Sequence, residues 1–354
     1  MQERKKYNTT IQLMRGLAVI MVVLQHSISR IAEIDFEFKI MYFLNHIDVA
    51  VFFVIAGYLF EIKKEKYYQE SKMSYIKGKA KALLLPYLFW SLILAVGIKV
   101  ASMFMTNLPS ITGIKPWSWK DIVINTVLFK DYNVQHLWFI YILFFFFVFN
   151  RLFKDALIDG KVFWAVVLGS IILNHIGLNY ILDKFVLHFA VFLIGRIVAK
   201  YNLLTHFKKW HMKIVAPCIL VLCFFSELFM WNSFTYTYLG NTIYALSGVY
   251  CIYMIAEFLS SVCNGTKTRF GLRKIGDYSF EIYLMHNPYI SMLVPIILRK
   301  VIPNTVVIVL ITTVLGIIVP YYFAKIMFHY SNVTSVLFGR KGIKNETCFF
   351  DYCA

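Results

Sequence analysis

Two ionisable residues within one apolar stretch are the first candidates for chemistry in this sequence. Arg15 and His26 interrupt residues 11–29, a segment long enough to cross a bilayer as a helix, which takes roughly 20 apolar residues. An ionisable side chain inside such a segment is energetically costly and is therefore a candidate functional group. The two residues are eleven positions apart, so an α-helix places them on nearly the same face, about 16 Å apart along its axis.

A structural role is the alternative for each of these side chains. Arg15 can extend its guanidinium to the membrane surface, and His26 can pack as an interfacial polar residue. The sequence has no G-x-S-x-G motif and no P-loop. In GDYS at 276–279, Tyr278 stands at the position where a GDS-type hydrolase block needs its serine. Histidine is therefore the best candidate for acid–base or covalent chemistry.

The composition is that of an integral membrane protein. Of the 354 residues, 59% are hydrophobic and 16% are charged, whereas soluble domains have about 25% charged residues. The net charge of +17 is compatible with nucleic-acid binding, but the basic residues lie between apolar segments and not on one soluble face. Basic cytoplasmic loops of a membrane protein explain the charge better, so we expect no nucleic-acid partner.

Ten apolar segments predict an all-α protein with about ten transmembrane helices. They cover residues 11–29, 41–61, 83–105, 136–152, 161–179, 181–199, 212–231, 239–261, 275–298 and 304–328. With the N-terminus inside, 25 Lys and Arg residues fall in the inner segments and 7 in the outer loops. This bias predicts that both termini are cytoplasmic. We expect a single transmembrane domain at 1–335 and a short cytoplasmic tail at 336–354.

The predicted topology groups several polar residues toward the outer side of the membrane. His26, Asp48, His136 and Trp138 lie near the outer ends of their segments, and His286 lies near mid-depth. These levels are compatible with an aqueous cavity that opens outward and narrows toward the cytoplasm.

Plainer interpretations stand beside this one. His136 with Trp138 is also typical of an aromatic belt at the membrane interface. We interpret His175 as structural, and we expect Glu227, close to the end of its segment, to reach the surface.

A second group of residues lies toward the inner side and is cationic. It includes Arg15, Lys81, Arg196 and Arg273. A cationic inner group and a histidine-rich outer group suit a reaction that draws an anionic donor from the cytoplasm and acts on an acceptor outside. The six cysteines include no C-x-x-C pair, so neither a zinc site nor a disulfide framework is indicated, and we expect no metal.

Five motifs occur in the same order as in a known family. They are Arg15 and His26 with ten residues between them, the block Phe52-Phe53-Val54-Ile55-Ala56-Gly57-Tyr58, Pro86-Tyr87 after a basic stretch, HLWF at 136–139, and Tyr283-Leu284 with His286. Over residues 5–330 the chain resembles the integral membrane acyltransferases of acyltransferase family 3, especially the short branch of sugar O-acetyltransferases. Ala56 stands where the family usually has Ser, and Lys79 and Lys81 stand where it commonly has Arg.

The resemblance implies a membrane O-acyltransferase. An acyl group, usually acetyl, would pass from cytoplasmic acetyl-CoA to a hydroxyl of a cell-surface or lipid-linked carbohydrate. His26 would be the general base or would carry the acyl group transiently, with Arg15 and His286 as further catalytic residues. For binding we expect two sets of residues: Arg15, Arg196, Lys81 and Arg273 for acyl-CoA, and Asp48, His136, Trp138 and Tyr58 for the acceptor.

The resemblance also implies a setting. The chain would be a multi-pass protein of the bacterial plasma membrane, surrounded by membrane lipids, with proteins of polysaccharide biosynthesis as candidate partners. Two other classes stay open on the residues alone: a transporter of a sugar-linked lipid or small solute, and a membrane partner protein without catalysis. Transporters often contain inverted repeats, and the sequence shows none.

Overall fold

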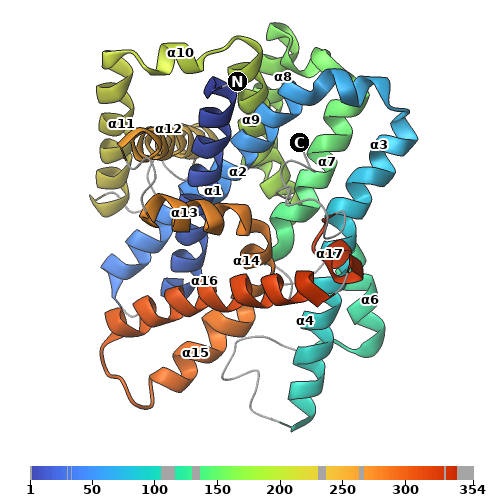
Figure 1. Ribbon diagram of the computed structural model, residues 1–354, viewed down its shortest axis with the longest axis vertical. Coiled ribbons are helices and arrows are strands. Elements are labelled where there is room, and N and C mark those ends of the chain that lie inside the picture. Colours follow the sequence, from blue (N-terminus) through green and yellow to red (C-terminus); the bar gives the residue numbers. More distant parts are fainter. Residues whose placement is uncertain are drawn as a thin grey trace.

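The computed structural model describes residues 2–29, 31–32, 34–104, 116–129, 136–229, 237–262, 267–330 and 332–340. Within these ranges the regular elements are all helices, as predicted (Figure 1). The first half of the chain forms α1 (Gln2–Ser29), α2 (Asp35–Gln69), α3 (Lys72–Lys79), the π-helical turn η1 (Ala80–Leu84), α4 (Leu85–Phe104), α6 (Trp119–Leu128), α7 (Trp138–Phe153), the 3-10 helix η3 (Lys154–Ile158), α8 (Gly160–Ile176) and α9 (Tyr180–Lys200).

The second half begins with the short helix α10 and ends beside the first half. It forms α10 (Leu204–Phe207), α11 (Trp210–Phe229), α12 (Tyr238–Val262), α13 (Lys267–Asp277), α14 (Ser279–Met285), the π-helical turn η5 (His286–Ile290), α15 (Ser291–Leu298), α16 (Thr305–Tyr330) and α17 (Asn332–Leu337). The helices do not run in one common direction. In Figure 1, α16 crosses the molecule while α12 is seen nearly end-on.

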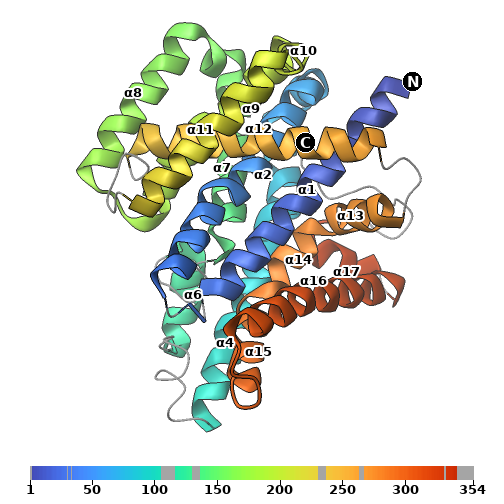
Figure 2. The same ribbon diagram turned by 90° about the vertical axis from the view of Figure 1, so that its left-hand side faces the viewer.

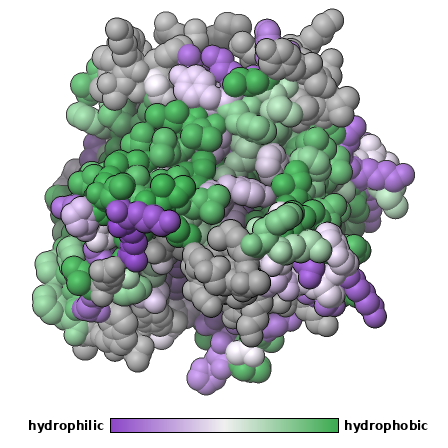
Figure 3. Space-filling view, turned by 90° about the horizontal axis from the view of Figure 1, so that it is seen from below, coloured by the Kyte–Doolittle hydropathy of each residue, from purple (hydrophilic) through white to green (hydrophobic). Residues whose placement is uncertain are grey.

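Several helices are suited to a bilayer by length and by the side chains they expose. Among the described residues, six helices are long and apolar enough to cross a membrane. Large apolar side chains face outward, including Phe104 with 84% exposure and Phe229 with 77%. Hydrophobic side chains also cover much of the face seen from below (Figure 3). Burying this surface in lipid removes it from water, and the chain is an all-α membrane protein as predicted.

The predicted number of ten spans and the cytoplasmic position of both ends stay predictions. The helix pair formed by Trp138–Ile158 and Gly160–Ile176 is bent by 117°, and as one broken span it would bring the number to seven. The predicted ninth span, 275–298, is divided into several short helices. Its interruption is at Asn287, whose φ of −123° and ψ of 138° are not helical. Local backbone geometry of this kind is not visible in apolar composition.

Helices α2 and α9 approach each other so closely that only glycine fits at the crossing. A Cβ on Gly57 would overlap the carbonyl oxygen of Phe192, and a Cβ on Gly195 would overlap that of Val54. Small residues that let two backbones meet are the usual means of close helix packing in membranes. The two helices therefore behave as one unit within the fold.

A second glycine pair joins α1 to α13. A Cβ on Gly276 would overlap the carbonyl oxygen of Gln12, and a Cβ on Gly16 would lie 2.5 Å from the carbonyl oxygen of Leu272. Figure 2 shows α13 against α1, with α14 and α16 next in line. This contact brings the start of α14 to the level of Arg15.

The first residues of the predicted tail, 336–340, are packed onto the helices. Phe338 is 2% exposed and lies against Trp90, whose indole nitrogen donates to the carbonyl of Leu337 at 3.3 Å. Arg340 Nε donates to Glu281 at 2.6 Å, which ties this segment to α14. Residues 341–354 lie outside the described part of the chain.

The glycine crossing leads to a prediction for stability. We expect Gly57→Ala to lower the free energy of unfolding by about 1–3 kcal/mol, because the added methyl group forces the α2 and α9 backbones apart. Thermal unfolding of the purified protein in detergent measures this loss. Gly97→Ala in α4 is the control, since a Cβ there meets nothing within 4 Å; equal stability of both variants would contradict a tight crossing.

Candidate active site

Three histidines from three separate parts of the chain meet inside the molecule. His26 lies in the last turn of α1, His136 lies just before α7, and His286 lies where α14 passes into η5. The ring centroids of His26 and His286 are 5.1 Å apart, and those of His136 and His286 are 6.2 Å apart. The structure thus brings together three of the predicted site residues, which we call the histidine cluster.

His286 is the most enclosed member of this cluster. Its side chain is fully buried, and Nδ1 lies 2.9 Å from the carbonyl oxygen of Tyr283 and 3.0 Å from that of Ile282. A carbonyl accepts hydrogen bonds only, so Nδ1 carries the proton and Nε2 of the neutral ring keeps its lone pair. Within the described part of the chain, Nε2 has no hydrogen-bond partner. This nitrogen is therefore placed to accept a proton.

The helix break and a tyrosine hold the cluster in place. Asn287 is extended, and its side-chain oxygen accepts from Ser291 Oγ at 2.7 Å on the far side of the break. The hydroxyl of Tyr283 donates to the backbone carbonyl of His136, which ties α14 to the start of α7. His26, by contrast, is only partly buried, so its ring is more accessible than that of His286.

Arg15 is buried on the same helix as His26. It is 2% exposed, and its Nη2 lies 3.3 Å from Ser279 Oγ at the first residue of α14. One rigid helix therefore carries both a guanidinium and an imidazole, and α14 with η5 carries the residues that meet each of them. This agrees with the spacing argument made from the sequence.

A second polar group lies beside the cluster, around Trp138. The Trp138 ring stacks on His188 with centroids 5.1 Å apart, and Lys184 Nζ lies 5.2 Å from the Trp138 ring centroid. Asp48 is 1% exposed and is close enough to Lys184 for electrostatic attraction. Sequence reasoning did not single out Lys184 and His188 as site residues. Their spacing of four residues on one helix was the available signal, since it places both on one face.

His46 and Glu227 form a further buried contact. Their nearest side-chain nitrogen and oxygen are 3.8 Å apart, and Nδ1 of His46 lies 2.7 Å from Asn241 Nδ2. The expectation that Glu227 reaches the surface is wrong, because this residue is only 2% exposed. Its carboxylate turns inward toward the imidazole, a partner far away in the sequence.

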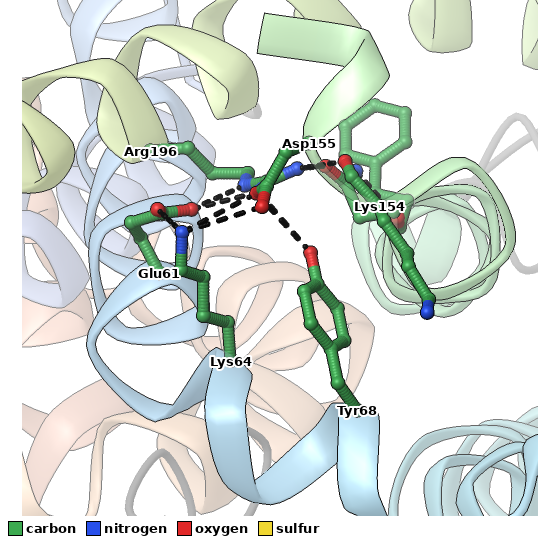
Figure 4. A network of polar contacts seen from close by, with 8 residues as sticks. Glu61, Lys64, Tyr68, Lys154, Asp155 and Arg196 are labelled. Carbon is green, nitrogen blue, oxygen red and sulfur yellow. Dashed lines mark hydrogen bonds and ion pairs between the residues drawn. The ribbon is translucent and has the colours of Figure 1, made fainter.

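Arg196 lies at the centre of a polar network that joins α2, α7, η3 and α9 (Figure 4). The residue is 0% exposed, and the guanidinium donates to five protein acceptors. They are Glu61 Oε2 at 2.7 and 2.9 Å, Asp155 Oδ1 at 2.8 Å, Asn150 Oδ1 at 2.8 Å, the Lys154 carbonyl at 2.7 Å, and the Tyr68 hydroxyl at 3.5 Å. An acyl donor would have to displace these groups, so the geometry favours a positioning role for Arg196.

The remaining predicted residues lie elsewhere. Lys81 in η1 and Arg273 in α13 are exposed. Tyr58 lines an apolar cavity whose walls include none of the three histidines. In the described ranges, no three His, Cys, Asp or Glu side chains are arranged to hold a metal ion.

The Arg196 network predicts a large cost for removing its cation. We expect Arg196→Gln to destabilise the protein by about 3–5 kcal/mol, because Glu61 and Asp155 lose the guanidinium that they share and only Lys64 remains beside them. Chemical unfolding in detergent measures the change. Glu61→Gln combined with Arg196→Gln should recover part of the loss, and Lys200→Gln, at the exposed end of the same helix, should be neutral. A loss below about 1 kcal/mol, no larger than that of a surface ion pair, would contradict the network's role.

Comparison with known proteins places this arrangement in a family. A family model described as an acyltransferase domain, that of acyltransferase family 3, matches residues 8–325 and thereby includes Arg15 and the histidine cluster. Comparisons with curated proteins and with solved structures give no match. Since the family match extends over nearly the whole chain, the chain belongs to acyltransferase family 3 and is a membrane acyltransferase.

Proposed function

We propose that this acyltransferase moves an acetyl group from cytoplasmic acetyl-CoA to a hydroxyl of a cell-surface or lipid-linked carbohydrate. The observation that carries the proposal is the histidine cluster on a helix that also bears a buried arginine. The imidazoles supply bases for a hydroxyl, and the guanidinium suits a polyanionic donor. The bacterial plasma membrane is the proposed location. The basic bias of the predicted inner segments supports the orientation in which both termini are cytoplasmic.

His26 is the proposed general base. An alcohol is a weak nucleophile until a base takes its proton as the new bond forms. In the direct route, the acceptor oxygen bonds to the thioester carbonyl carbon while the His26 imidazole takes the hydroxyl proton. The carbon–sulfur bond then breaks, and the proton passes to the departing thiolate of CoA. The same ring would attack the thioester itself in a two-step route.

His286 supports this assignment through its position. Its ring lies 5.1 Å from that of His26, centroid to centroid, and its Nδ1 is held by two backbone carbonyls. A ring held in this way has little freedom to rotate, and its Nε2 has no hydrogen-bond partner in the described part of the chain. It is therefore suited either to orient the acceptor hydroxyl or to receive its proton.

Arg15 is the proposed anchor for the donor. An α-helix places it about 16 Å from His26 along the axis, a span comparable to an extended pantetheine arm. The phosphates would lie at the level of Arg15 and the thioester at the level of the cluster. Because Lys81 and Arg273 are exposed, they are proposed to meet the nucleotide end of the donor at the protein surface.

The acceptor is proposed to bind beside Trp138. An indole face and buried polar groups are a suitable combination for a sugar, which has an apolar ring face and hydroxyls at its rim. Trp138 provides the aromatic face, and Asp48 and His188 provide acceptors and donors close by. His136 links this region to the cluster, since it lies two residues before Trp138.

Replacing His26 tests the catalytic assignment. We expect His26→Ala to lower acetyl transfer by about 10²–10⁴-fold, the usual contribution of a general base, without loss of expression or membrane insertion. Acetyl-CoA-dependent labelling of surface glycan in a strain that lacks the gene measures transfer. His175→Ala, at the exposed end of α8, should retain most activity. If His26→Ala labels glycan at nearly the wild-type rate, His26 is not the base and His286 becomes the candidate.

Replacing Arg15 tests the donor site separately. We expect Arg15→Gln to weaken CoA binding by about 10–100-fold, because a hydrogen bond to a charged group contributes roughly 1.5–3 kcal/mol. Equilibrium binding of CoA to the purified protein measures the affinity. Lys300→Gln, at an exposed position outside the proposed site, removes the same charge as a control. Equal affinities of the two variants would remove Arg15 from the donor site.

A further inference from the structure

An apolar cavity of about 330 Å³ lies between α1, α2, α9, α10, α11 and α12, away from the histidine cluster. It is partly open to the exterior, and of the residues expected to take part in acyl transfer only Tyr58 lines it. Its walls are formed mainly by aliphatic and aromatic side chains, among them Met14, Val54, Val198, Phe207, Ala216 and Ile219. A volume of this size is at the lower end of that found for small-molecule sites in proteins.

Two hydroxyl groups of the cavity wall donate hydrogen bonds within the protein. Ser247 Oγ donates to the Tyr244 carbonyl at 2.9 Å, and the Tyr250 hydroxyl donates to the Phe207 carbonyl at 2.7 Å. These hydroxyl protons are therefore used within the protein. The wall favours an alkyl chain and suits neither a nucleotide nor a sugar, which would lose their hydrogen bonds to water on entry.

One wall of the cavity follows the axis of α11. Met212, Ala216 and Ile219 line it at positions i, i+4 and i+7, which form one face of a helix. The distance from Met212 to Ile219 along the axis is about 10 Å. An elongated occupant can therefore lie along α11 and extend from the beginning of this helix toward its middle.

The beginning of α11 has the character of a membrane interface. Trp210 is 74% exposed, as is typical of tryptophans at the level of lipid headgroups. It lies between exposed Lys209 and Lys213, and Lys208 Nζ is 3.1 Å from Glu257. The neighbouring residues Phe207 and Met212 line the cavity. Cations and an interfacial indole are thus next in the sequence to residues that line one end of the apolar cavity. Figure 1 shows α10 at the top of the molecule, leading into α11.

We propose that this cavity binds one acyl chain of an anionic phospholipid, with the lipid phosphate beside Lys209 and Lys213. The apolar walls fit the chain, and the lysines complement the charge of the headgroup. The position of the cavity along α11 also fits a lipid, because an acyl chain that starts at the level of Trp210 can enter the cavity along this helix. The proposal depends on neither the acyl donor nor the acceptor of the enzyme.

Lipid binding by the delipidated protein tests this proposal. Native mass spectrometry counts bound lipid while phosphatidylglycerol or phosphatidylcholine with identical chains is added. We expect one phosphatidylglycerol to be retained at least several-fold more tightly than phosphatidylcholine. Ala216→Trp should abolish this tight binding by filling the cavity, whereas Leu222→Trp, on the exposed face of the same helix with 68% exposure, should not. Equal binding by these two variants would overturn the proposal.

The charge at the headgroup is tested without altering the cavity walls. We expect the pair Lys209→Gln with Lys213→Gln to remove the preference for phosphatidylglycerol. Lys120→Gln with Lys300→Gln, two exposed lysines elsewhere, should keep it. Glycerol 3-phosphate, which has the phosphate but no chain, should not compete. Competition by glycerol 3-phosphate, or an unchanged preference in the Lys209 and Lys213 variant, would show that no lipid is bound in the way we propose.

Discussion

Backbone-to-backbone contact at two glycine pairs fixes the helices on which the site depends. Gly16 and Gly276 let α1 meet α13, and Gly57 and Gly195 let α2 meet α9. The first contact sets where α14 begins, and therefore where Ser279 meets Arg15. Since packing in lipid gains little from the hydrophobic effect, close van der Waals contact has to supply much of the stability. A side chain at either crossing would separate the elements that carry the site.

The second pair lies next to the Arg196 network, since Glu61 follows Gly57 by about one helical turn. Gly195 precedes Arg196 directly, so the close crossing delivers the guanidinium to Glu61 on α2. A buried arginine without counter-charge would be very costly, and two carboxylates together with neutral acceptors make its burial tolerable. Glycine and arginine thus act together: the first permits the approach, and the second fixes the rotation of α9 against α2. Lys184 and His188 of α9 are then held on the face that meets Trp138.

The helical class and the placement of Arg15 and His26 on one face of α1 could be predicted from the sequence, because both follow from local residue patterns. Apolar length indicates a span, and the spacing of Arg15 and His26 places them on one helix face without knowledge of any other helix. The convergence of His26, His136 and His286 required the fold, since the three lie on segments far apart in the chain. The resemblance to the family indicated these residues, but it gave no distance between their rings.

Residues with distant partners were the hardest to interpret from sequence. From its predicted depth alone, Arg196 looks like a residue that binds the acyl donor. Its carboxylate partner Glu61 lies 135 residues earlier in the sequence. Glu227 looks like a surface residue because it lies near a span end, yet His46 draws it inward. In both cases the burial of an ionisable side chain depends on tertiary contacts, and such contacts leave no periodic pattern in the sequence.

Helix α1 separates the apolar cavity from the active site and belongs to both. Ile11 and Met14 line the cavity, whereas Arg15, the next residue, faces Ser279 of α14. Successive helical residues point about 100° apart, so one turn of α1 presents an apolar wall on one side and a cation on the other. A lipid chain in the cavity would press on Met14 and limit sideways movement of the helix. Because His26 lies on the same helix, occupancy of the cavity would also restrict the position of its imidazole, the proposed general base.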